Sequence, residues 1–223
     1  MRYFEFYNPV KICAGQDALG NLLYEAQSLG MERPLLLSDE TLTKLGLVKR
    51  FQDWTGLRNC LLYDRVPPDS SVDTVNDIAA LYRREGCRGI VALGGGSVLD
   101  TGKGVRLLIG QGETDILKLM GCENLPRGAH VPFIAVPTTA GTGSECTPVA
   151  VIRHPAKSVK LEYISSCMMP DAAVLDGRMT QSLPPRITAA TGLDALCHAI
   201  EAYTCGQKNP MSDAYALSAM GII

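Results

Sequence analysis

A glycine-rich turn offers the first candidate for chemistry. Gly95, Gly96 and Ser97 stand between a short apolar run at residues 90–93 and a segment with helical spacing at residues 98–108. Glycine lets the backbone turn tightly and leaves room for a ligand, and serine often caps a helix. The free amides and the dipole at such a helix N-terminus attract phosphate. The pattern predicts a strand, a glycine turn and a phosphate-binding helix end, which is typical of a nucleotide site.

Two named phosphate-binding motifs do not fit this turn. The GxGxxG pattern needs glycine where the chain has Leu99, and the GxxxxGK[ST] pattern fails in its spacing and after Lys103. A tight turn whose glycines serve geometry alone is therefore an open alternative. Further evidence for a nucleotide must come from other parts of the chain.

A second loop, at residues 137–148, is rich in glycine and hydroxyl groups. Thr138, Thr139, Thr142 and Ser144 offer hydroxyls that could hydrogen-bond a cofactor. The alternative is a loop whose hydroxyls bond its own backbone.

Asp39 directly follows an apolar run at residues 34–38 that we expect to be a buried strand. Ligands of an open α/β sheet bind at the carboxyl ends of its strands. An acidic side chain there can accept hydrogen bonds from ribose hydroxyls and would repel a 2′-phosphate. Asp39 could instead only cap a helix that begins at Thr41.

A carboxylate and an imidazole stand four residues apart near the C-terminal end of the sequence. Asp194 and His198 lie in a segment with helical spacing at residues 187–203, so they share one helix face. Such a pair could bind a divalent ion, Fe²⁺ or alternatively Zn²⁺, which acts as a Lewis acid. Two ligands do not complete a site, and a hydrogen bond on the helix surface is the simpler alternative.

Apolar runs that alternate with helical segments must position these residues. The alternation predicts a mostly parallel, Rossmann-like sheet with helices on both faces, which is an α/β fold. We expect an N-terminal strand or hairpin at residues 3–12, with its turn at Asn8-Pro9, and helices at residues 17–29 and 72–85. The other strands are expected at residues 34–38, 60–63, 90–93, 133–136, 149–152, 160–164 and 173–175.

The pattern changes after Pro184-Pro185. From there the apolar spacing is helical only, so we expect an α/β domain at residues 1–180 and the start of an all-helical domain at residues 181–223. The sequence ends at Ile223 within its second expected helix, as the front portion of a longer protein would.

Composition narrows the partners. The formal charge of −2 and the scattered lysines and arginines do not favour nucleic acid. No apolar stretch is long enough to span a membrane, and no signal peptide is evident. The 8 cysteines form no CxxC pair, so reduced thiols and a cytoplasmic location are expected.

Three segments together resemble the iron-containing, or group III, alcohol dehydrogenases. They are GGGSVLD at residues 94–100, PTTAGTGSE at residues 137–145 and GLDALCHAIEAY at residues 192–203, in that order. The resemblance runs along the whole chain. It implies an α/β nucleotide-binding domain and an all-helical domain, with NAD and a metal ion meeting in the cleft between them.

The resemblance also implies residue roles. Asp39 would bind the adenosine ribose and favour NAD over NADP, and the metal ligands would be Asp194 and His198. Other cofactor-binding residues would be Gly95, Gly96, Ser97, Asp100, Thr138, Thr139, Thr142 and, on less distinctive surroundings, Lys160.

Two departures from the family pattern stand out. The family takes two further histidine ligands from beyond the position of Ile223, which leaves the activity of the 223-residue chain open. Many relatives have Asn-Pro where this chain has Pro68-Asp69, so a cofactor contact from that loop is in doubt.

The function implied for the full-length protein is NAD-dependent, metal-assisted interconversion of a small primary alcohol and its aldehyde by hydride transfer. No general base is evident in this portion, and the resemblance implies a homo-oligomer. One alternative is a polyol dehydrogenase of the glycerol type. Another is a noncatalytic nucleotide-binding module.

Overall fold

The computed structural model describes residues 3–223; Met1 and Arg2, at the start of the first expected domain, lie outside the described residues. Its centre is a six-stranded sheet in the order β1-β8-β5-β4-β2-β3, and every pair in it is parallel. The strands are β1 Lys11–Ala14, β2 Leu35–Leu37, β3 Leu61–Tyr63, β4 Ile90–Gly94, β5 Phe133–Pro137 and β8 Ala172–Leu175. The predicted parallel α/β fold is confirmed.

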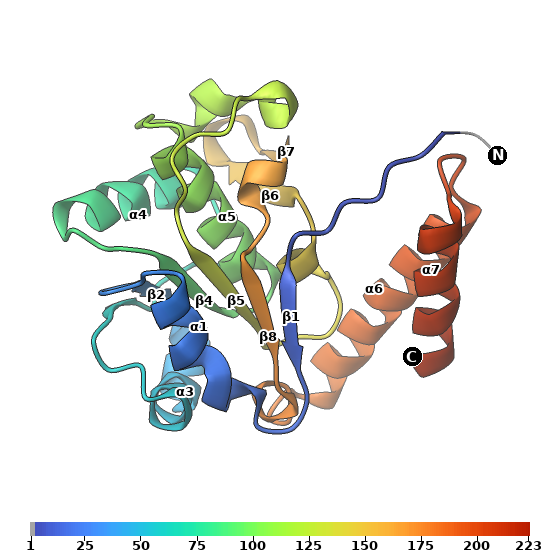
Figure 1. The fold of residues 1–223 in the computed structure, drawn as a ribbon, viewed down its shortest axis with the longest axis horizontal. Coiled ribbons are helices and arrows are strands. Elements are labelled where there is room, and N and C mark those ends of the chain that lie inside the picture. Colours follow the sequence, from blue (N-terminus) through green and yellow to red (C-terminus); the bar gives the residue numbers. More distant parts are fainter. Residues whose placement is uncertain (1–2) are drawn as a thin grey trace.

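Helices cover both faces of this sheet (Figure 1). Successive side chains of a strand point to opposite faces. Leu35 and Leu37 pack with the layer of α4 and α5, whereas Leu36 packs with the layer of α1 and α3. These central strands are buried on both faces, which explains their continuous apolar runs. The helices are α1 Leu22–Ser28, α2 Glu40–Lys44, α3 Leu47–Thr55, α4 Val72–Arg84 and α5 Gly96–Gly110.

The neighbouring strands β2 and β4 send the chain to opposite faces. The chain leaves β2 toward α3 and leaves β4 toward α5, which belong to different layers. Open α/β sheets bind ligands at such a point, between the carboxyl ends of two neighbouring strands, and we refer to this position as the crevice. Ser38 and Asp39 lie at the end of β2, and Gly95 lies at the end of β4.

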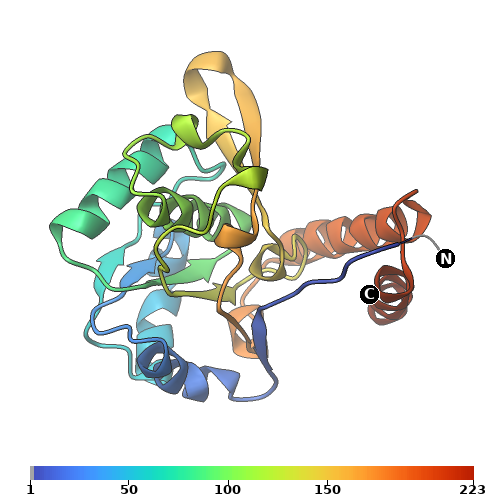
Figure 2. The ribbon, with the colours of Figure 1, turned by 45° about the horizontal axis from the view of Figure 1, so that its top comes forward.

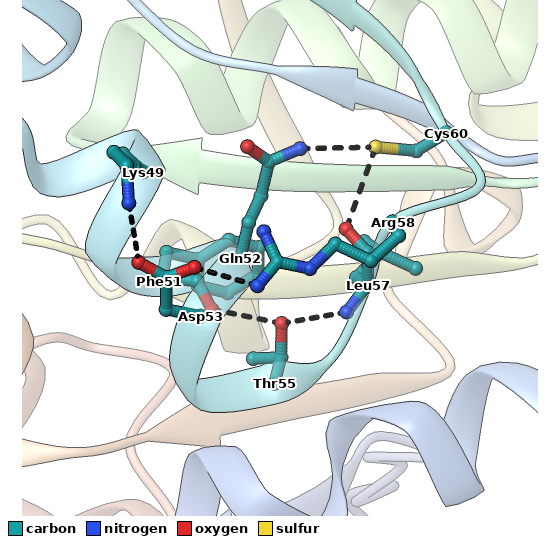
Figure 3. A network of polar contacts seen from close by, with 8 residues as sticks. All are labelled: Lys49, Phe51, Gln52, Asp53, Thr55, Leu57, Arg58 and Cys60. Atoms are coloured by element: carbon teal, nitrogen blue, oxygen red, sulfur yellow. Dashed lines mark hydrogen bonds and ion pairs between the residues drawn. The ribbon is translucent and has the colours of Figure 1, made fainter.

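A polar network closes the C-terminal end of α3 (Figure 3). Asp53 accepts hydrogen bonds from Lys49 at 2.9 Å and from Arg58 at 2.6 Å. Thr55 donates to the carbonyl oxygen of Phe51 at 2.8 Å, and its own hydroxyl accepts from the Leu57 amide at 3.2 Å. We refer to these contacts as the α3 corner; the pairs of Asp53 are exposed, whereas the contacts of Thr55 are buried.

A β-hairpin stands away from the main sheet (Figure 2). Strands β6 Val149–His154 and β7 Val159–Ile164 lie where strands were predicted at residues 149–152 and 160–164, and they pair antiparallel. Ala150, Ile152 and Tyr163 face inward and join the core around α5. The hairpin is thereby fixed beside the first turns of α5.

The last two helices form a pair at one side of the molecule (Figures 1 and 2). They are α6 Pro185–Thr204 and α7 Pro210–Ile222, and no strand occurs in the described chain after β8. Asn209 and Ser212 form a capping box at the start of α7. The N-terminal segment runs across to this pair, where Phe6 stacks on Tyr215 with ring centroids 6.0 Å apart.

Short 3₁₀ helices complete the connections. They are η1 Ala18–Asn21, η2 Ile116–Leu119, η3 Cys122–Asn124, η4 Ser144–Cys146, η5 Pro155–Lys157, η6 Ser166–Met168 and η7 Gly177–Met179.

The predicted N-terminal strand or hairpin at residues 3–12 is wrong in its bounds and form. The strand begins only at Lys11, whose amide donates to the Asp171 carbonyl oxygen, and it pairs parallel with β8. Asn8 accepts a hydrogen bond from the Val10 amide at 3.1 Å, but no antiparallel partner strand precedes it in the described residues. Pairing starts where the chain first reaches the sheet edge, which local alternation does not reveal.

Candidate functional site

The glycine turn between β4 and α5 leaves the helix end uncapped by any side chain. Gly95 is the N-cap residue, and its carbonyl oxygen accepts from the amides of Val98 and Leu99 at 3.0 and 3.1 Å. The amides of Gly96 and Ser97 lie in the first turn, where a helix offers no internal acceptor. These amides are available to an anion.

The expectation that Ser97 caps α5 is wrong. The helix begins at Gly96, one residue before this serine, so the Ser97 hydroxyl is free for another contact. It accepts a hydrogen bond from the Asp69 amide at 3.1 Å. Ser97 therefore ties the loop before α4 to the first turn of α5.

The second loop packs directly on the glycine turn. The Thr138 amide donates to the Gly94 carbonyl oxygen at 3.0 Å. A Cβ atom on Gly96 would lie 3.0 Å from Cγ2 of Thr142, so glycine here also serves packing. The Thr142 hydroxyl accepts a hydrogen bond from the Ser144 amide at 3.2 Å. At this position the loop therefore bonds its own backbone, which was the alternative to a cofactor contact. The predicted phosphate turn and the second predicted cofactor loop are thus neighbours.

Asp100, on α5, holds this second loop through hydrogen bonds. Its Oδ1 accepts from the Ser144 hydroxyl at 2.6 Å, and its Oδ2 accepts from the Val151 amide at 3.0 Å. Burial raises the pKa of the Asp100 carboxyl, and both hydrogen bonds oppose that shift. In this structure Asp100 holds the loop and the start of β6 against α5.

Lys103 reinforces the same attachment, and sequence reasoning missed it. Its side chain is buried, and its Nζ donates to Thr147 Oγ1 at 3.0 Å and to the Val149 carbonyl oxygen at 2.8 Å. Burial lowers the pKa of Lys103 to about 8, against the attraction of Asp100 and Glu145. The available signal was its place three residues after Asp100, on the same helix face. We call these contacts of Asp100 and Lys103 the α5 anchor.

Asp39 stands at the crevice but apart from the other predicted residues. Its Oδ1 accepts from the Leu42 amide at 2.9 Å, so it caps α2 as the simpler alternative proposed. Beside it, the Ser38 hydroxyl donates to the Leu93 carbonyl oxygen at 3.0 Å and ties the end of β2 to β4. One carboxylate oxygen of Asp39 remains outside this cap.

Lys160 reaches the glycine turn from the hairpin. Its Nζ lies 2.8 Å from Oδ1 of Asp69, whose own amide binds Ser97. Asp69 is a site residue that sequence reasoning placed in a doubtful loop without assigning a role. The Lys160 hydrogen bond lowers the pKa of the Asp69 carboxyl.

The two predicted metal ligands share one face of α6. Oδ1 of Asp194 and Nε2 of His198 are 3.8 Å apart, and both side chains are about half exposed. A carboxylate and an imidazole suit Fe²⁺ or Zn²⁺, so the donor types fit. No group of three or more His, Cys, Asp or Glu in residues 3–223 could hold a metal ion. Within the described residues this pair alone therefore does not complete a metal site.

One cavity joins the phosphate turn to this helix face. Its volume is about 1010 Å³, and α6 reaches it beside Gly141, where a Cβ atom would lie 2.9 Å from the Thr191 carbonyl oxygen. Gly95, Thr138, Thr139 and Asp39 do not line it. The predicted residues that do are Gly96, Ser97, Asp100, Thr142, Lys160, Asp194 and His198.

The fold and this cavity define a class of protein: a parallel α/β unit with a glycine turn at its cavity, which is bordered by a helix carrying a carboxylate and an imidazole. The chain belongs to the iron-containing alcohol dehydrogenase family. Residues 9–177 match the family model for iron-containing alcohol dehydrogenase, and residues 188–223 match the model for the C-terminal part of the family.

Known proteins agree with this assignment. The chain is 37% identical to the probable alcohol dehydrogenase EutG of Salmonella typhimurium, over 96% of this chain and 54% of that protein. A 1,3-propanediol oxidoreductase structure aligns with a TM-score of 0.90 at 35% identity, over 97% of this chain and 56% of that one. The structure of a sulfoacetaldehyde reductase from Bifidobacterium kashiwanohense in complex with NAD⁺ aligns with a TM-score of 0.91 at 29% identity. The alignment covers 99% of this chain and 58% of that one. The chain spans about half the length of the relatives it matches.

Proposed function

We propose that the full-length protein interconverts a primary alcohol and its aldehyde by exchanging hydride with NAD, with help from a metal ion. The observation that carries the proposal is the single cavity lined by the first turn of α5 and by Asp194 and His198. Family membership supports the reaction class. The relative solved with NAD⁺ supports the choice of cofactor.

The cofactor would lie across the crevice between β2 and β4. Uncapped amides of Gly96 and Ser97 would bind its pyrophosphate, with Gly95 shaping the turn. The carboxylate of Asp39, at the opposite side of the crevice, would accept hydrogen bonds from the adenosine ribose and disfavour a 2′-phosphate.

The second loop would bind the cofactor from the other side. The side chains of Thr139 and Thr142 lie beside Gly95 and Gly96, and the Thr138 amide binds the Gly94 carbonyl oxygen. Asp100 keeps that loop in place through Ser144. Lys160 brings a positive charge to the cavity. Because the cofactor is anionic, this charge supports binding.

Asp194 and His198 would hold the metal ion, Fe²⁺ or alternatively Zn²⁺, together with ligands from outside this chain's 223 residues. Such an ion supplies Lewis acidity toward the substrate oxygen when it is bound. The side chains of α6 would set the place of the substrate relative to the cofactor.

Three further proposals concern the whole protein. We propose that residues 1–180 and 181–223 belong to different domains, which the change to helices alone after β8 supports. No helix of the described chain has the length and apolarity needed to cross a membrane. Free cysteines at all 8 positions support a reducing cytoplasm. The family resemblance supports a homo-oligomer.

Titration of the chain with NADH and NADPH, followed by nicotinamide fluorescence, tests the cofactor assignment. NADH should bind, NADPH should bind more weakly because of Asp39, and Asp39→Asn should narrow that difference. Equal binding of both cofactors by the unaltered chain would contradict the role of Asp39.

Metal content of the full-length protein after anaerobic loading with Fe²⁺ tests the second half of the site. Asp194→Ala and His198→Ala should each lower the iron retained, while Cys197→Ala on the same helix should not. Iron retention that is unchanged in both variants would contradict the assignment.

A second function is favoured for the 223 residues alone. Because these described residues, from Tyr3 onward, hold no group of three metal donors, a chain of this length would bind the dinucleotide without catalysis. NADH binding without iron retention or alcohol oxidation would support this noncatalytic function.

A further inference from the structure

The loop before α4 brings a carboxylate into the cofactor cavity. Asp69 lines this cavity together with Ser97 and Lys160. Its backbone adopts the left-handed region with a φ of 55°, and its amide donates to the Ser97 hydroxyl at 3.1 Å. The loop is therefore tied to the same helix turn that would bind the pyrophosphate.

The carboxylate of Asp69 is paired with Lys160, one of the cations that line this cavity. Its Oδ1 lies 2.8 Å from Nζ of Lys160, and the two side chains are 54% and 59% exposed. Lys160 holds the pKa of the Asp69 carboxyl below its ordinary value, and Arg153, which also lines the cavity, acts in the same direction. Asp69 is consequently ionised at neutral pH.

Two anionic groups can therefore pair with the ammonium group of Lys160: the Asp69 carboxylate and a phosphate of the cofactor. A dinucleotide seated on the first turn of α5 brings two phosphate charges to the side of the cavity where Asp69 and Lys160 meet. While Lys160 is paired with Asp69, its charge attracts a phosphate less. The Asp69 carboxylate also repels the phosphates directly, since like charges at close range raise the free energy.

We propose that Asp69 limits the affinity of this chain for the dinucleotide by competing with its phosphates for Lys160. The inference rests on the proposed function and adds a specificity-determining residue to it. The pair is exposed to solvent on both sides, and exposed ion pairs are weak. Lys160 can therefore exchange Asp69 for the cofactor at little cost, and the carboxylate favours release of the cofactor when it returns.

Asp69→Asn is the variant that isolates the charge. Asparagine has the same shape as aspartate and tolerates the left-handed backbone region equally well, so the loop and its amide bond to Ser97 are kept. We expect the dissociation constant for NADH to fall about threefold to fivefold, as the strength of an exposed ion pair implies. The gain should shrink at high salt, because salt screens these charges.

Adenosine is the probe that separates charge from loop structure. It fits the nucleoside part of the crevice but carries no phosphate, so Asp69→Asn should leave its affinity unchanged. A general change in the loop would alter the affinities for adenosine and NADH together.

Glu113→Gln serves as the matched control. Glu113 pairs with Lys118 at 3.1 Å on the surface beyond α5, with similar exposure and outside the cavity. The Glu113→Gln substitution changes the net charge by the same amount as Asp69→Asn. The NADH affinity of this variant should stay at the level of the unaltered chain. An equal gain in both variants would overturn the proposal, since net charge alone would then explain it.

The remaining outcomes are distinct. NADH binding that is unchanged or weaker in Asp69→Asn, with an unchanged thermal midpoint, would overturn the competition while leaving the proposed function intact. If neither the unaltered chain nor the Asp69→Asn variant binds NADH, both proposals are overturned. Tighter NADH binding with unchanged adenosine binding would support the competition.

Discussion

Two aspartates in different regions of this protein make the same number of hydrogen bonds with opposite consequences. Asp53 in the α3 corner accepts from Lys49 and Arg58, and these bonds lower the pKa of its carboxyl. Asp100 in the α5 anchor accepts from Ser144 and Val151, yet burial raises its pKa. Burial outweighs bonding at Asp100 because its partners are neutral. The charged anchor is therefore costly to form, and it stands where the cofactor loop must be held.

Removing the carboxylate from the anchor should have the largest effect. Asp100→Ala leaves the Ser144 hydroxyl and the Val151 amide without their acceptor and opens a small void. We expect the free energy of unfolding to fall by about 3 to 4 kcal/mol. Urea unfolding measures it, with Asp53→Ala as the control. A loss equal to that of the Asp53 variant would contradict the distinction between the two regions.

The second prediction concerns the pH dependence of stability that Lys103 gives to the α5 anchor. Its pKa is about 8 in the folded protein and 10.5 ordinarily, so the unfolded chain holds the proton longer as pH rises. The free energy of unfolding should therefore rise between pH 8 and 10.5, by about 3 kcal/mol relative to a Lys103→Met variant that lacks the group. Urea unfolding of both proteins across this range measures the difference. A difference that stays constant with pH would show that Lys103 is not held in the charged, buried state.

Crowding the turn above the anchor should have a smaller effect on stability than on binding. Gly96→Ala brings a methyl group within 3.0 Å of Thr142 Cγ2 and should cost about 1 kcal/mol. Thr142→Ser removes that methyl contact, so the double variant should regain stability. NADH affinity should stay low in both, because the added methyl group still covers the phosphate position. Recovery of affinity in the double variant would show that this glycine serves loop packing alone.

The α3 corner should show the smallest effect. Asp53→Asn weakens two exposed ion pairs, so the thermal midpoint should change little and less still in high salt. Because the pKa of Asp53 is lowered in the folded protein, its contribution to the free energy of unfolding is fully present above the ordinary pKa of 3.8. This contribution is lost as the pH falls through the pKa of the folded protein. Thermal scans in acid should therefore show a slightly steeper loss in the unaltered chain than in the variant. A large loss at neutral pH would contradict the comparison.

Sequence patterns predicted the sheet well because buried parallel strands are apolar on both faces. The runs at β2, β4 and β5 are unbroken for this reason, and the helices between them have clear spacing. The N-terminal strand was misplaced, since pairing of Lys11 with β8 depends on a strand far along the chain. Ser97 was misread as a cap because the N-cap is Gly95, two residues earlier, and such a shift leaves the apolar pattern unchanged.

The sequence by itself determined the parallel fold, the glycine turn and the carboxylate–imidazole spacing of Asp194 and His198, since these follow from local apolar periodicity and helix geometry. Only the tertiary structure decided that Lys103 lies buried beneath the second loop, and that Asp69 meets Lys160 across 91 positions of chain. Contacts of this kind depend on how β6, β7 and α5 pack together. Burial then shifts the pKa values of Asp100 and Lys103, and no local pattern records it.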